Sequence, residues 1–457
     1  MYNIAATYYP QKGFLVVLGA GESGYGAAVL AQQKGFDVFV SDNGKIQTEY
    51  ADLLKEKGID FEENKHSKDR ILKADLVVKS PGIPSISPLV QALKNGNTPV
   101  ISEIEFAAQY TSAKIIAITG SNGKTTTCQL TYEMLKKGGH NVGLAGNIGK
   151  SFAYQVATGN YDEYVLELSS FMLDDMYHFR ADIAVLLNIT PDHLDRYQND
   201  FQLYTDSKLR IVQNQKKNDV FIYCIDDENI VKSFDKHEIK AKKLPFSQKK
   251  KLAEGAYIEE EQKLVIKISE ENIFKMDIEK LSLRGKHNLY NNMASGLVGK
   301  VQELRNQAMK ESMSEYTNIP HRLEHVAYIR GVNYINDSKA TNVNSVWYAL
   351  ESFSTDIVLI IGGVDKGNDY EMLRDLVKQK VKAIVCIGRD NSRIHEAFEE
   401  EIDVIVNSTS MQDAVEIASH IADKGDTVLL SPACASFDWF KNFEDRGNQF
   451  KEAVMEL

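Results

Sequence analysis

One stretch, residues 115–127, limits the possible folds of this chain more than any other. An apolar, β-branched run predicts a strand, a short glycine turn follows it, and Lys124 begins a segment with helical spacing that ends in Lys136, Lys137 and two glycines. Backbone N–H groups of such a turn and of a helix N-terminus converge on phosphate, while lysine adds charge and a threonine hydroxyl binds Mg²⁺. The stretch therefore predicts a phosphate-binding loop. Ile118 stands where the usual motif has its first glycine, so an ordinary strand-to-helix turn is the alternative.

Length and charge narrow the class of protein. A chain of 457 residues is too long for one core, and a prior of about 150 residues per domain suggests three domains. The net charge of -11 argues against nucleic-acid binding, which requires a basic face. No apolar run approaches the length of a membrane span, and the first 13 residues lack the pattern of a leader, so we expect a cytoplasmic protein without membrane insertion. The four scattered cysteines are expected to be buried thiols in a reducing compartment.

The first α/β region has the pattern of a dinucleotide-binding fold. A strand over residues 14–18 leads into Gly19, Gly21 and Gly24, and Asp42 ends the next strand at about the place of a ribose-binding carboxylate. A βα turn that binds nothing is the alternative. Another strand within residues 74–84 closes in a Pro/Gly turn, and its Ser80, Pro81 and Gly82 are expected to face the same crevice, because ligands collect at the carboxyl ends of parallel strands.

The second α/β region places charged residues beside the phosphate loop. Glu167 interrupts an apolar strand pattern, where an ionised carboxylate needs a cation or several donors, and Mg²⁺ shared with Thr125 is the natural cation. The alternative is a Glu on the exposed side of an edge strand. The strand within residues 183–190 delivers His193 to the same sheet edge, near metal or substrate. Pattern alone makes Lys208, on a following helix, a solvated lysine.

Two further regions complete the chain. Residues 212–280 alternate short strands with charge runs, which predicts solvated loops and an antiparallel extension of the sheet. Asn288 and Asn291 lie three apart at a helix start, where their amides satisfy an adenine edge or cap the helix. Beyond residue 318, strands at 356–361, 383–387 and 427–430 alternate with helical stretches, which predicts a third α/β sheet with polar residues at its strand ends.

Taken together, these regions resemble the Mur ligases, and the resemblance runs from the first glycine turn almost to the C-terminus. The motifs follow in the family's order: Thr119-Gly-Ser-Asn-Gly-Lys-Thr-Thr126, Leu166-Glu-Leu-Ser-Ser-Phe171, Asn188-Ile-Thr-Pro-Asp-His-Leu-Asp-Arg-Tyr197, Lys286-His-Asn288, Pro320-His-Arg322, Asn336-Asp-Ser-Lys-Ala-Thr341 and Ser431-Pro-Ala-Cys-Ala-Ser436. The last motif, with the stretch from Lys441 to Gly447, is similar to the D-glutamate-adding branch, and the Asp-Asn-Pro-Arg motif of the diamino-acid-adding branch is absent.

The resemblance implies an α/β protein of three domains: a Rossmann-like UDP-binding domain at 1–104, a central P-loop ATPase domain with a mainly parallel sheet at 105–318, and a Rossmann-like amino-acid-binding domain at 319–457. It further implies an ATP-dependent ligase of peptidoglycan synthesis that forms an amide bond through an acyl phosphate. The substrates implied are UDP-N-acetylmuramoyl-L-alanine and D-glutamate, the cofactors are ATP and Mg²⁺ at two sites, and we expect a monomer.

Site residues follow from the same resemblance. Lys124, Glu167, His193 and Lys208 are the implied catalytic residues, with Lys208 carrying a carbamate, a role that reverses the pattern-based view of a solvated side chain. The implied metal ligands are Thr125, Glu167, His193 and Lys208. The implied ATP contacts are Gly120, Ser121, Asn122, Gly123, Lys124, Thr125, Thr126, Asn288, Asn291, Arg322 and Asp337. The implied UDP-substrate contacts are Gly19, Gly21, Glu22, Ser23, Asp42, Ser80, Pro81, Gly82, Asn147 and His193, and those to D-glutamate are Lys339, Thr341, Lys366, Ser436 and Phe443. Asn43 and Gly44 after Asp42 depart from the family's usual Thr-Arg.

Other functions remain open on the sequence. A folylpolyglutamate synthetase belongs to the same superfamily, but the UDP-type N-terminal domain argues against it. A nicotinamide-dependent dehydrogenase is suggested by Gly19, Gly21, Gly24 and Asp42, but it leaves Lys124 and Glu167 without a role. A scaffold that binds Mg·ATP without turnover is the third alternative.

Overall fold

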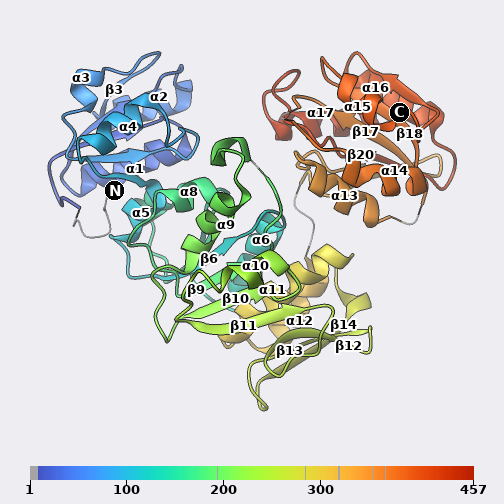
Figure 1. Cartoon of the computed structure of the whole chain (residues 1–457), viewed down its shortest axis with the longest axis horizontal. Helices are drawn as coiled ribbons and strands as arrows, with labels where there is room; N and C mark the ends of the chain where they lie inside the picture. Colours follow the sequence, from blue (N-terminus) through green and yellow to red (C-terminus); the bar gives the residue numbers. More distant parts are fainter. Residues whose placement is uncertain (1–8, 193, 284, 317–319, 354, 366) are drawn as a thin grey trace. The chain divides into compact units, whose positions relative to one another are not determined.

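The computed structural model describes residues 9–192, 194–283, 285–316, 320–353, 355–365 and 367–457. The chain divides into two compact units. The first comprises Met1–Leu281 with Tyr290–Glu315, and the second comprises Ser282–Leu289 with Tyr316–Leu457 (Figure 1).

The first sheet, at the start of unit one, has five parallel strands in the order β3-β2-β1-β4-β5. Its elements are β1 (Phe14–Leu18), α1 (Glu22–Gln33), β2 (Asp37–Ser41), α2 (Thr48–Glu56), β3 (Asp60–Glu62), α3 (Lys68–Ile71), β4 (Leu76–Lys79), α4 (Pro88–Asn95), β5 (Val100–Ser102) and α5 (Glu103–Ala108). The order reverses at β1, and the glycine turn after β1 therefore lies at the switch point where such sheets bind ligands.

The second sheet of unit one has nine strands in the order β14-β13-β12-β11-β10-β9-β6-β8-β7. Its elements are β6 (Lys114–Thr119), α6 (Lys124–Lys137), β7 (Val142–Gly146), α7 (Phe152–Thr158), β8 (Glu163–Glu167), α8 (Ser170–Asp174), β9 (Ile183–Leu186), η2 (Leu194–Tyr197), α9 (Phe201–Leu209), η3 (Arg210–Val212), β10 (Val220–Cys224), α10 (Glu228–Ser233), β11 (Lys242–Ser247), β12 (Gly255–Glu259), β13 (Lys263–Lys267), β14 (Ile273–Asp277), η4 (Ile278–Lys280), α11 (Lys286–Val301) and α12 (Asn306–Glu315). In the order of the sheet, all neighbouring pairs from β7 through β8, β6, β9, β10 and β11 to β12 are parallel. Strands β12, β13 and β14 pair antiparallel and form the expected extension.

The sheet of the second unit has six strands in the order β15-β16-β20-β17-β18-β19, parallel except for the pair β15 and β16. Its elements are β15 (Glu324–Ile329), β16 (Val332–Asn336), α13 (Val343–Glu351), β17 (Ile357–Gly362), η5 (Glu371–Leu373), α14 (Arg374–Lys380), β18 (Val381–Ile387), α15 (Ser392–Phe398), β19 (Ile405–Asn407), α16 (Met411–Ile421), β20 (Thr427–Leu430) and α17 (Phe443–Met455).

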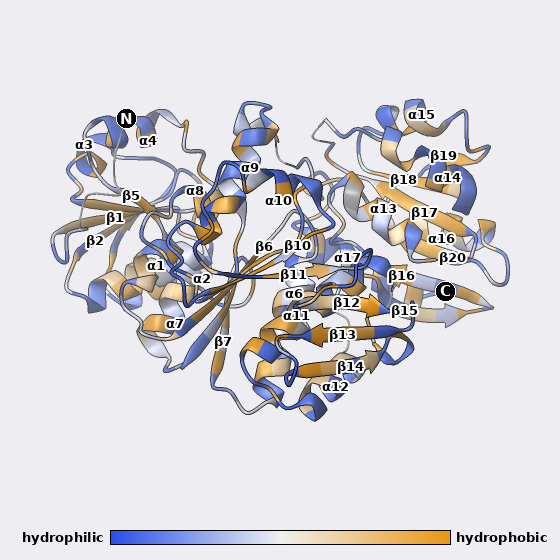
Figure 2. Ribbon diagram, turned by 60° about the horizontal axis from the view of Figure 1, so that its bottom comes forward, coloured by the Kyte–Doolittle hydropathy of each residue, from blue (hydrophilic) through white to orange (hydrophobic). Residues whose placement is uncertain are grey.

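The core of the second unit follows from the alternation of side chains along a strand. Leu359 in β17 joins one apolar cluster with α13, α14 and α15, whereas its neighbours Val358 and Ile360 join another with α16 and α17. Helices thus cover both faces, which explains why β17 is buried along its whole length. Figure 2 shows β17 and β6 coloured as hydrophobic strands.

Most of the predicted elements are confirmed. Helix α6 runs from Lys124 to Lys137 as predicted, with the two terminal lysines in its last turn. All four cysteines are buried, and none of them forms a disulfide. In the described part of the chain, none of the helices has the length and apolarity needed to cross a bilayer. The domain boundaries at 104/105 and 318/319 stay predictions.

Candidate active site

The carboxyl ends of three neighbouring strands form the candidate site of unit one. In the pairing of β6 with β8, Ile118 lies opposite Glu167, and in the pairing of β6 with β9, Thr119 lies opposite Leu186. The glycine turn after β6, the carboxylate that ends β8 and the segment after β9 therefore meet at one sheet edge. The sequence predicted this meeting because parallel strands deliver their following loops to the same side.

Gly123 shows why the loop requires glycine. Its φ is +81°, in the left-handed region, and a Cβ there would overlap the Asn291 side chain. The Asn291 Oδ1 accepts a hydrogen bond of 3.2 Å from the Thr127 hydroxyl. Asn291 is thus placed against the phosphate loop, where the sequence predicted an ATP contact.

Lys124 folds its side chain back over the loop. Its Nζ donates to the carbonyl oxygens of Gly120 at 2.8 Å and Ser121 at 2.7 Å. These contacts hold the ammonium group beside the turn that is expected to receive phosphate.

Glu167 is the buried carboxylate that the sequence predicted. Strand β8 lies between β6 and β7, and Glu167 is only 1% exposed, so the alternative of an exposed Glu on an edge strand is wrong. Its Oε1 accepts a hydrogen bond of 2.9 Å from the Asn147 amide, whereas Oε2 is buried without a hydrogen-bond partner. A buried carboxylate oxygen without a donor is costly. This free oxygen fits a cation site in which one carboxylate, a threonine hydroxyl and the nucleotide phosphates are the ligands.

Lys208 is buried, contrary to the pattern-based view of a solvated lysine. It is 2% exposed, its Nζ donates to Gly120 O at 2.8 Å, and it lies 4.7 Å from the centroid of the Tyr204 ring. Burial, and then the charge of Lys124, lowers the pKa of Lys208 well below its usual value. The periodicity of α9 gave no sign of this burial, because the segments that cover the side chain come from elsewhere in the chain.

Three residues that were not predicted as site residues, Thr190, Tyr204 and Asn188, hold the loop in place. The Ser121 hydroxyl donates to Thr190 O at 2.8 Å and lies 2.9 Å from the Tyr204 hydroxyl. The backbone N–H of Asn122 donates to the side-chain Oδ1 of Asn188 at 2.8 Å. Asn188 belongs to a motif already quoted, so its place directly after a buried strand was the available signal. Thr125 and Thr126 are buried in the first turn of α6.

The glycine turn of the first sheet is closed by the predicted carboxylate. Asp42 accepts hydrogen bonds of 2.8 Å from the backbone N–H groups of Ala20 and Gly44. It therefore stabilises both the glycine turn after β1 and the turn that follows β2. Gly24 lies so close to Gly19 O that a Cβ would overlap it. Glu22, predicted as a substrate contact, accepts from the Ser151 amide at 2.9 Å and from the Tyr50 hydroxyl at 2.8 Å. Gly21 and Ser23 lie at the start of α1, and Ser80, Pro81 and Gly82 follow β4.

Asp337 is a buried carboxyl among the predicted site residues of the second unit. Its Oδ2 accepts from the Ser431 hydroxyl at 2.9 Å, and its Oδ1 accepts from the Leu323 amide at 3.2 Å. Burial raises the pKa of Asp337 to about 7, against the lowering influence of Arg322. Arg322 Nε is buried without a hydrogen-bond partner. Asn288 lies in the part of α11 that belongs to this unit.

The pKa of Asp337 predicts a change of stability with pH. Its ordinary pKa is 3.8 and the folded value is about 7, so between these values the folded protein holds a proton that the unfolded chain has lost. Stability therefore falls as pH rises through this window. We expect Asp337→Asn to raise the melting temperature, relative to the native chain, more at about pH 8 than at about pH 5. Asp356→Asn, at an exposed position before β17, serves as the control. An equal shift at both pH values would contradict the prediction.

Four of the five predicted D-glutamate residues, Lys339, Thr341, Ser436 and Phe443, lie on or next to segments that Arg446 ties together. Lys339 Nζ is 5.3 Å from the centroid of the Phe443 ring, Ser436 is buried and Thr341 is exposed. Arg446 is 0% exposed and donates to the Ser338 hydroxyl at 3.0 Å, to Ser338 O at 2.8 Å and to Cys434 O at 3.0 Å. Burial lowers its pKa to about 10. A guanidinium fork suits three acceptors on two segments.

Two predicted residues, His193 and Lys366, lie outside the described residues. Across the described ranges, there is no group of three or more His, Cys, Asp or Glu side chains that could hold a metal ion. A Mg²⁺ ion bound mainly through nucleotide phosphates does not require such a group.

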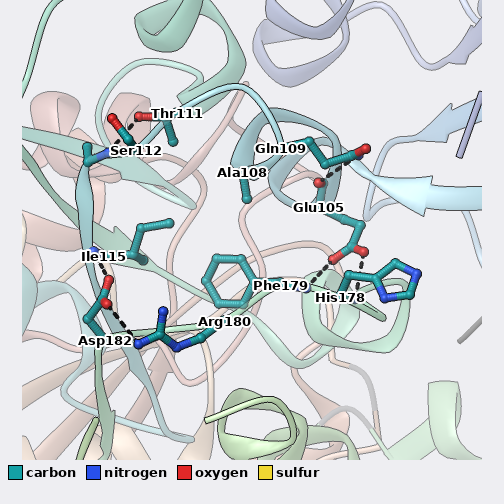
Figure 3. Close-up of a pocket in the computed structure, with 11 residues that line it drawn as sticks. Glu105, Ala108, Gln109, Thr111, Ser112, Ile115, His178, Phe179, Arg180 and Asp182 are labelled. Atoms are coloured by element: carbon teal, nitrogen blue, oxygen red, sulfur yellow. Dashed lines mark hydrogen bonds and ion pairs between the residues drawn. The ribbon is translucent and has the colours of Figure 1, made fainter. Parts of the chain in front are cut away.

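A cavity of about 320 Å³ lies at the other end of the central strands (Figure 3). It is lined near the starts of β6 and β9, where the Asp182 carboxylate accepts from the Ile115 amide at 2.8 Å. Glu105 in its wall accepts from the His178 and Phe179 amides at 2.7 and 2.8 Å. These carboxylates are already hydrogen-bonded, and the cavity is separate from the phosphate loop.

Three family models match the chain in order. They are the MurD N-terminal domain at residues 15–89, the Mur ligase middle domain at 118–299, and the Mur ligase, glutamate ligase domain at 321–434. Among solved structures, a pseudomurein peptide ligase type C from Methanothermus fervidus has a TM-score of 0.62 at 20% identity and covers 98% of this chain and 100% of its own. At that identity the likeness concerns the fold, an α/β fold of the Mur ligase class.

Curated relatives identify the particular family. The UDP-N-acetylmuramoylalanine--D-glutamate ligase of Bacteroides fragilis is 54% identical over 97% of this chain and 99% of its own length. That of Porphyromonas gingivalis is 50% identical over 97% of this chain and 98% of its own. The chain therefore belongs to the UDP-N-acetylmuramoylalanine--D-glutamate ligases, a family of the Mur ligases.

Proposed function

We propose that this enzyme joins D-glutamate to UDP-N-acetylmuramoyl-L-alanine by ATP-dependent formation of an amide bond, a step in the cytoplasmic synthesis of peptidoglycan precursors. The observation that carries the proposal is the identity of 54% with such a ligase over 97% of the chain. The buried Glu167 beside the phosphate loop supplies the physical support, because it suits transfer of a phosphoryl group. We propose that the enzyme acts as a monomer.

The proposed reaction proceeds in two steps. The L-alanine carboxylate oxygen attacks the γ-phosphorus of ATP, ADP leaves, and an acyl phosphate forms. The amine of D-glutamate then attacks the acyl carbon, inorganic phosphate leaves with the bonding electrons, and the amine loses a proton. Lys124 and the amides of the phosphate loop neutralise charge on the transferred group, where positioning and electrostatics supply most of the catalysis.

The proposed cation site uses residues that are already in place. Thr125 and Glu167 would hold Mg²⁺, which supplies charge neutralisation at the nucleotide phosphates when bound. Asn147 orients Glu167 through the hydrogen bond of 2.9 Å and leaves Oε2 for the cation. A second Mg²⁺ near His193, and a carbamate on Lys208 as its ligand, complete the proposed set.

We propose the remaining contacts as the family suggests. The nucleotide of ATP meets Asn288, Asn291, Arg322 and Asp337, while D-glutamate meets Lys339, Thr341, Lys366, Ser436 and Phe443. The uridine diphosphate lies on the turn of Gly19 and Gly21 with Glu22, Ser23, Asp42 and residues 80–82, and the muramoyl-alanine portion meets Asn147 and His193.

Phosphate release measured with UDP-N-acetylmuramoyl-L-alanine, Mg·ATP and either D- or L-glutamate tests the function. We expect release with the D-isomer alone. Release with a folate substrate instead would favour the related synthetases, and oxidation of NADH without phosphate release would favour a dehydrogenase. Tight binding of Mg·ATP without turnover would mark a scaffold.

A further inference from the structure

A buried ion pair outside the proposed catalytic set lies beneath the predicted UDP-substrate residues. Lys79, the last residue of β4, pairs with Asp175 at 2.9 Å, and both side chains are 2% exposed. Removing two charges from water is costly, and an apolar pair of similar volume often serves stability as well or better. Stability alone therefore gives no reason for a lysine inside an apolar strand.

The contacts of Lys79 indicate what the charge does. Besides Asp175, its ammonium group donates to Ser80 O at 3.2 Å and to Ile83 O at 2.8 Å. Three partners match the three N–H donors of a lysine. Two of these partners are carbonyls at the two ends of loop 80–83, which contains Ser80, Pro81 and Gly82.

A second cation holds the middle of the same loop. Arg196 donates to Pro81 O at 3.3 Å and to Gly82 O at 3.4 Å, and its guanidinium lies 4.4 Å from the centroid of the Phe171 ring. All four consecutive carbonyls of loop 80–83 thus accept a hydrogen bond from Lys79 or Arg196. Their negative ends face protein donors, and these four hydrogen bonds fix the conformation of the loop.

Asp175 and Arg196, which hold Lys79 and the loop, lie on segments that follow strands of the phosphate-loop sheet. Asp175 follows α8, which begins three residues after Glu167, and Arg196 lies in η2, after β9. The Ser102 amide also donates to Asp175 O at 2.9 Å, which fixes the anchor against the end of β5. The loop of the first sheet is therefore tied to the segments after β8 and β9.

We propose that Lys79, anchored by Asp175, and Arg196 are positioning residues that hold loop 80–83 in the conformation that binds the UDP-linked substrate. The inference rests on the proposed function, since the substrate is UDP-N-acetylmuramoyl-L-alanine. It assigns this role to a buried ion pair that the proposed reaction does not otherwise use.

The double variant Lys79→Met with Asp175→Leu tests the role apart from stability. It replaces the buried pair with apolar side chains, so we expect a melting temperature close to the native value. We expect KM for UDP-N-acetylmuramoyl-L-alanine to rise about tenfold, because two hydrogen bonds to the loop are lost. KM for ATP and for D-glutamate should stay unchanged.

Lys94→Met is the matched control. Lys94 Nζ lies 3.5 Å from the same Asp175 carboxylate, but no hydrogen bond joins it to loop 80–83 in the described structure. We expect a native KM for the UDP-linked substrate in this variant. Arg196→Met leaves the buried pair intact and should raise the same KM, with partial recovery in Arg196→Lys, so it decides the question if the double variant does not fold.

A native KM in the double variant, or an equal rise of KM for all three substrates, would overturn the positioning role. Failure of the native enzyme to release phosphate in response to D-glutamate would overturn the proposed function instead. The two failures are therefore separate results of one set of assays.

Discussion

Replacing Lys208 with alanine is expected to lower the rate of D-glutamate-dependent phosphate release by about three orders of magnitude, as loss of a group that stabilises transition-state charge does. Burial and the nearby charge of Lys124 lower the pKa of Lys208, so its amine is available in the neutral form. A neutral amine adds to CO₂ with loss of a proton, and the carbamate product carries a negative charge beside Lys124. The buried amine would thereby become an anionic oxygen ligand for Mg²⁺.

The measurement combines a rate with a direct view of the modification. Native mass spectrometry should show the mass of one added CO₂ on the native chain and none on Lys208→Ala. Phosphate release should slow in CO₂-depleted buffer and recover with bicarbonate. Lys208→Met, which keeps the bulk without a charge to bury, should be inactive but as thermally stable as the native protein.

Lys300 provides the matched control for Lys208. It is also a buried lysine of unit one, and burial likewise lowers its pKa. Its Nζ, however, donates to the Asn306 side chain at 3.0 Å. Lys300→Ala should keep the native rate. Normal turnover by Lys208→Ala would show that the carbamate assignment is wrong.

Glu167→Gln should lower kcat by about two to three orders of magnitude, because it removes the negative charge that we propose for the cation site while keeping the shape of the side chain. The half-saturating concentration of Mg²⁺ should rise in parallel. Steady-state phosphate release measured over a range of Mg²⁺ concentrations gives both quantities.

Glu163→Gln makes the same chemical change at the start of β8, where Glu163 lies 3.2 Å from the His140 ring nitrogen. This control should leave kcat and the Mg²⁺ dependence unchanged. If Glu167→Gln gives native values as well, the buried carboxylate does not bind the catalytic cation.

The predictions that succeeded rest on local patterns with a direct physical cause. Helix α6 begins at Lys124 and ends after Lys137, because glycine turns bound it and cations favour its last turn. Glu167 stood out because a carboxylate in an apolar strand needs a partner, and its exposure of 1% confirms that it is buried, with Oε1 bonded to Asn147 and Oε2 without a hydrogen-bond partner. Lys79 carried the same signal, a charge at the end of an apolar strand, and was not singled out.

By itself, the sequence determined the three α/β regions, the strand, glycine turn and helix of residues 115–127 and the family, since each depends on residues close together or on motifs in a fixed order. The tertiary structure alone decided that Lys208 is buried against Gly120, that Arg446 joins the segments of Ser338 and Cys434, and that Lys79 and Arg196 hold loop 80–83. The contacts of Lys208 with Gly120, of Arg446 with Ser338 and of Arg196 with Pro81 join residues far apart in the chain, and Asp175, the ion-pair partner of Lys79, is equally distant from it. Local periodicity cannot report them, because burial and pKa depend on which distant segment covers each side chain.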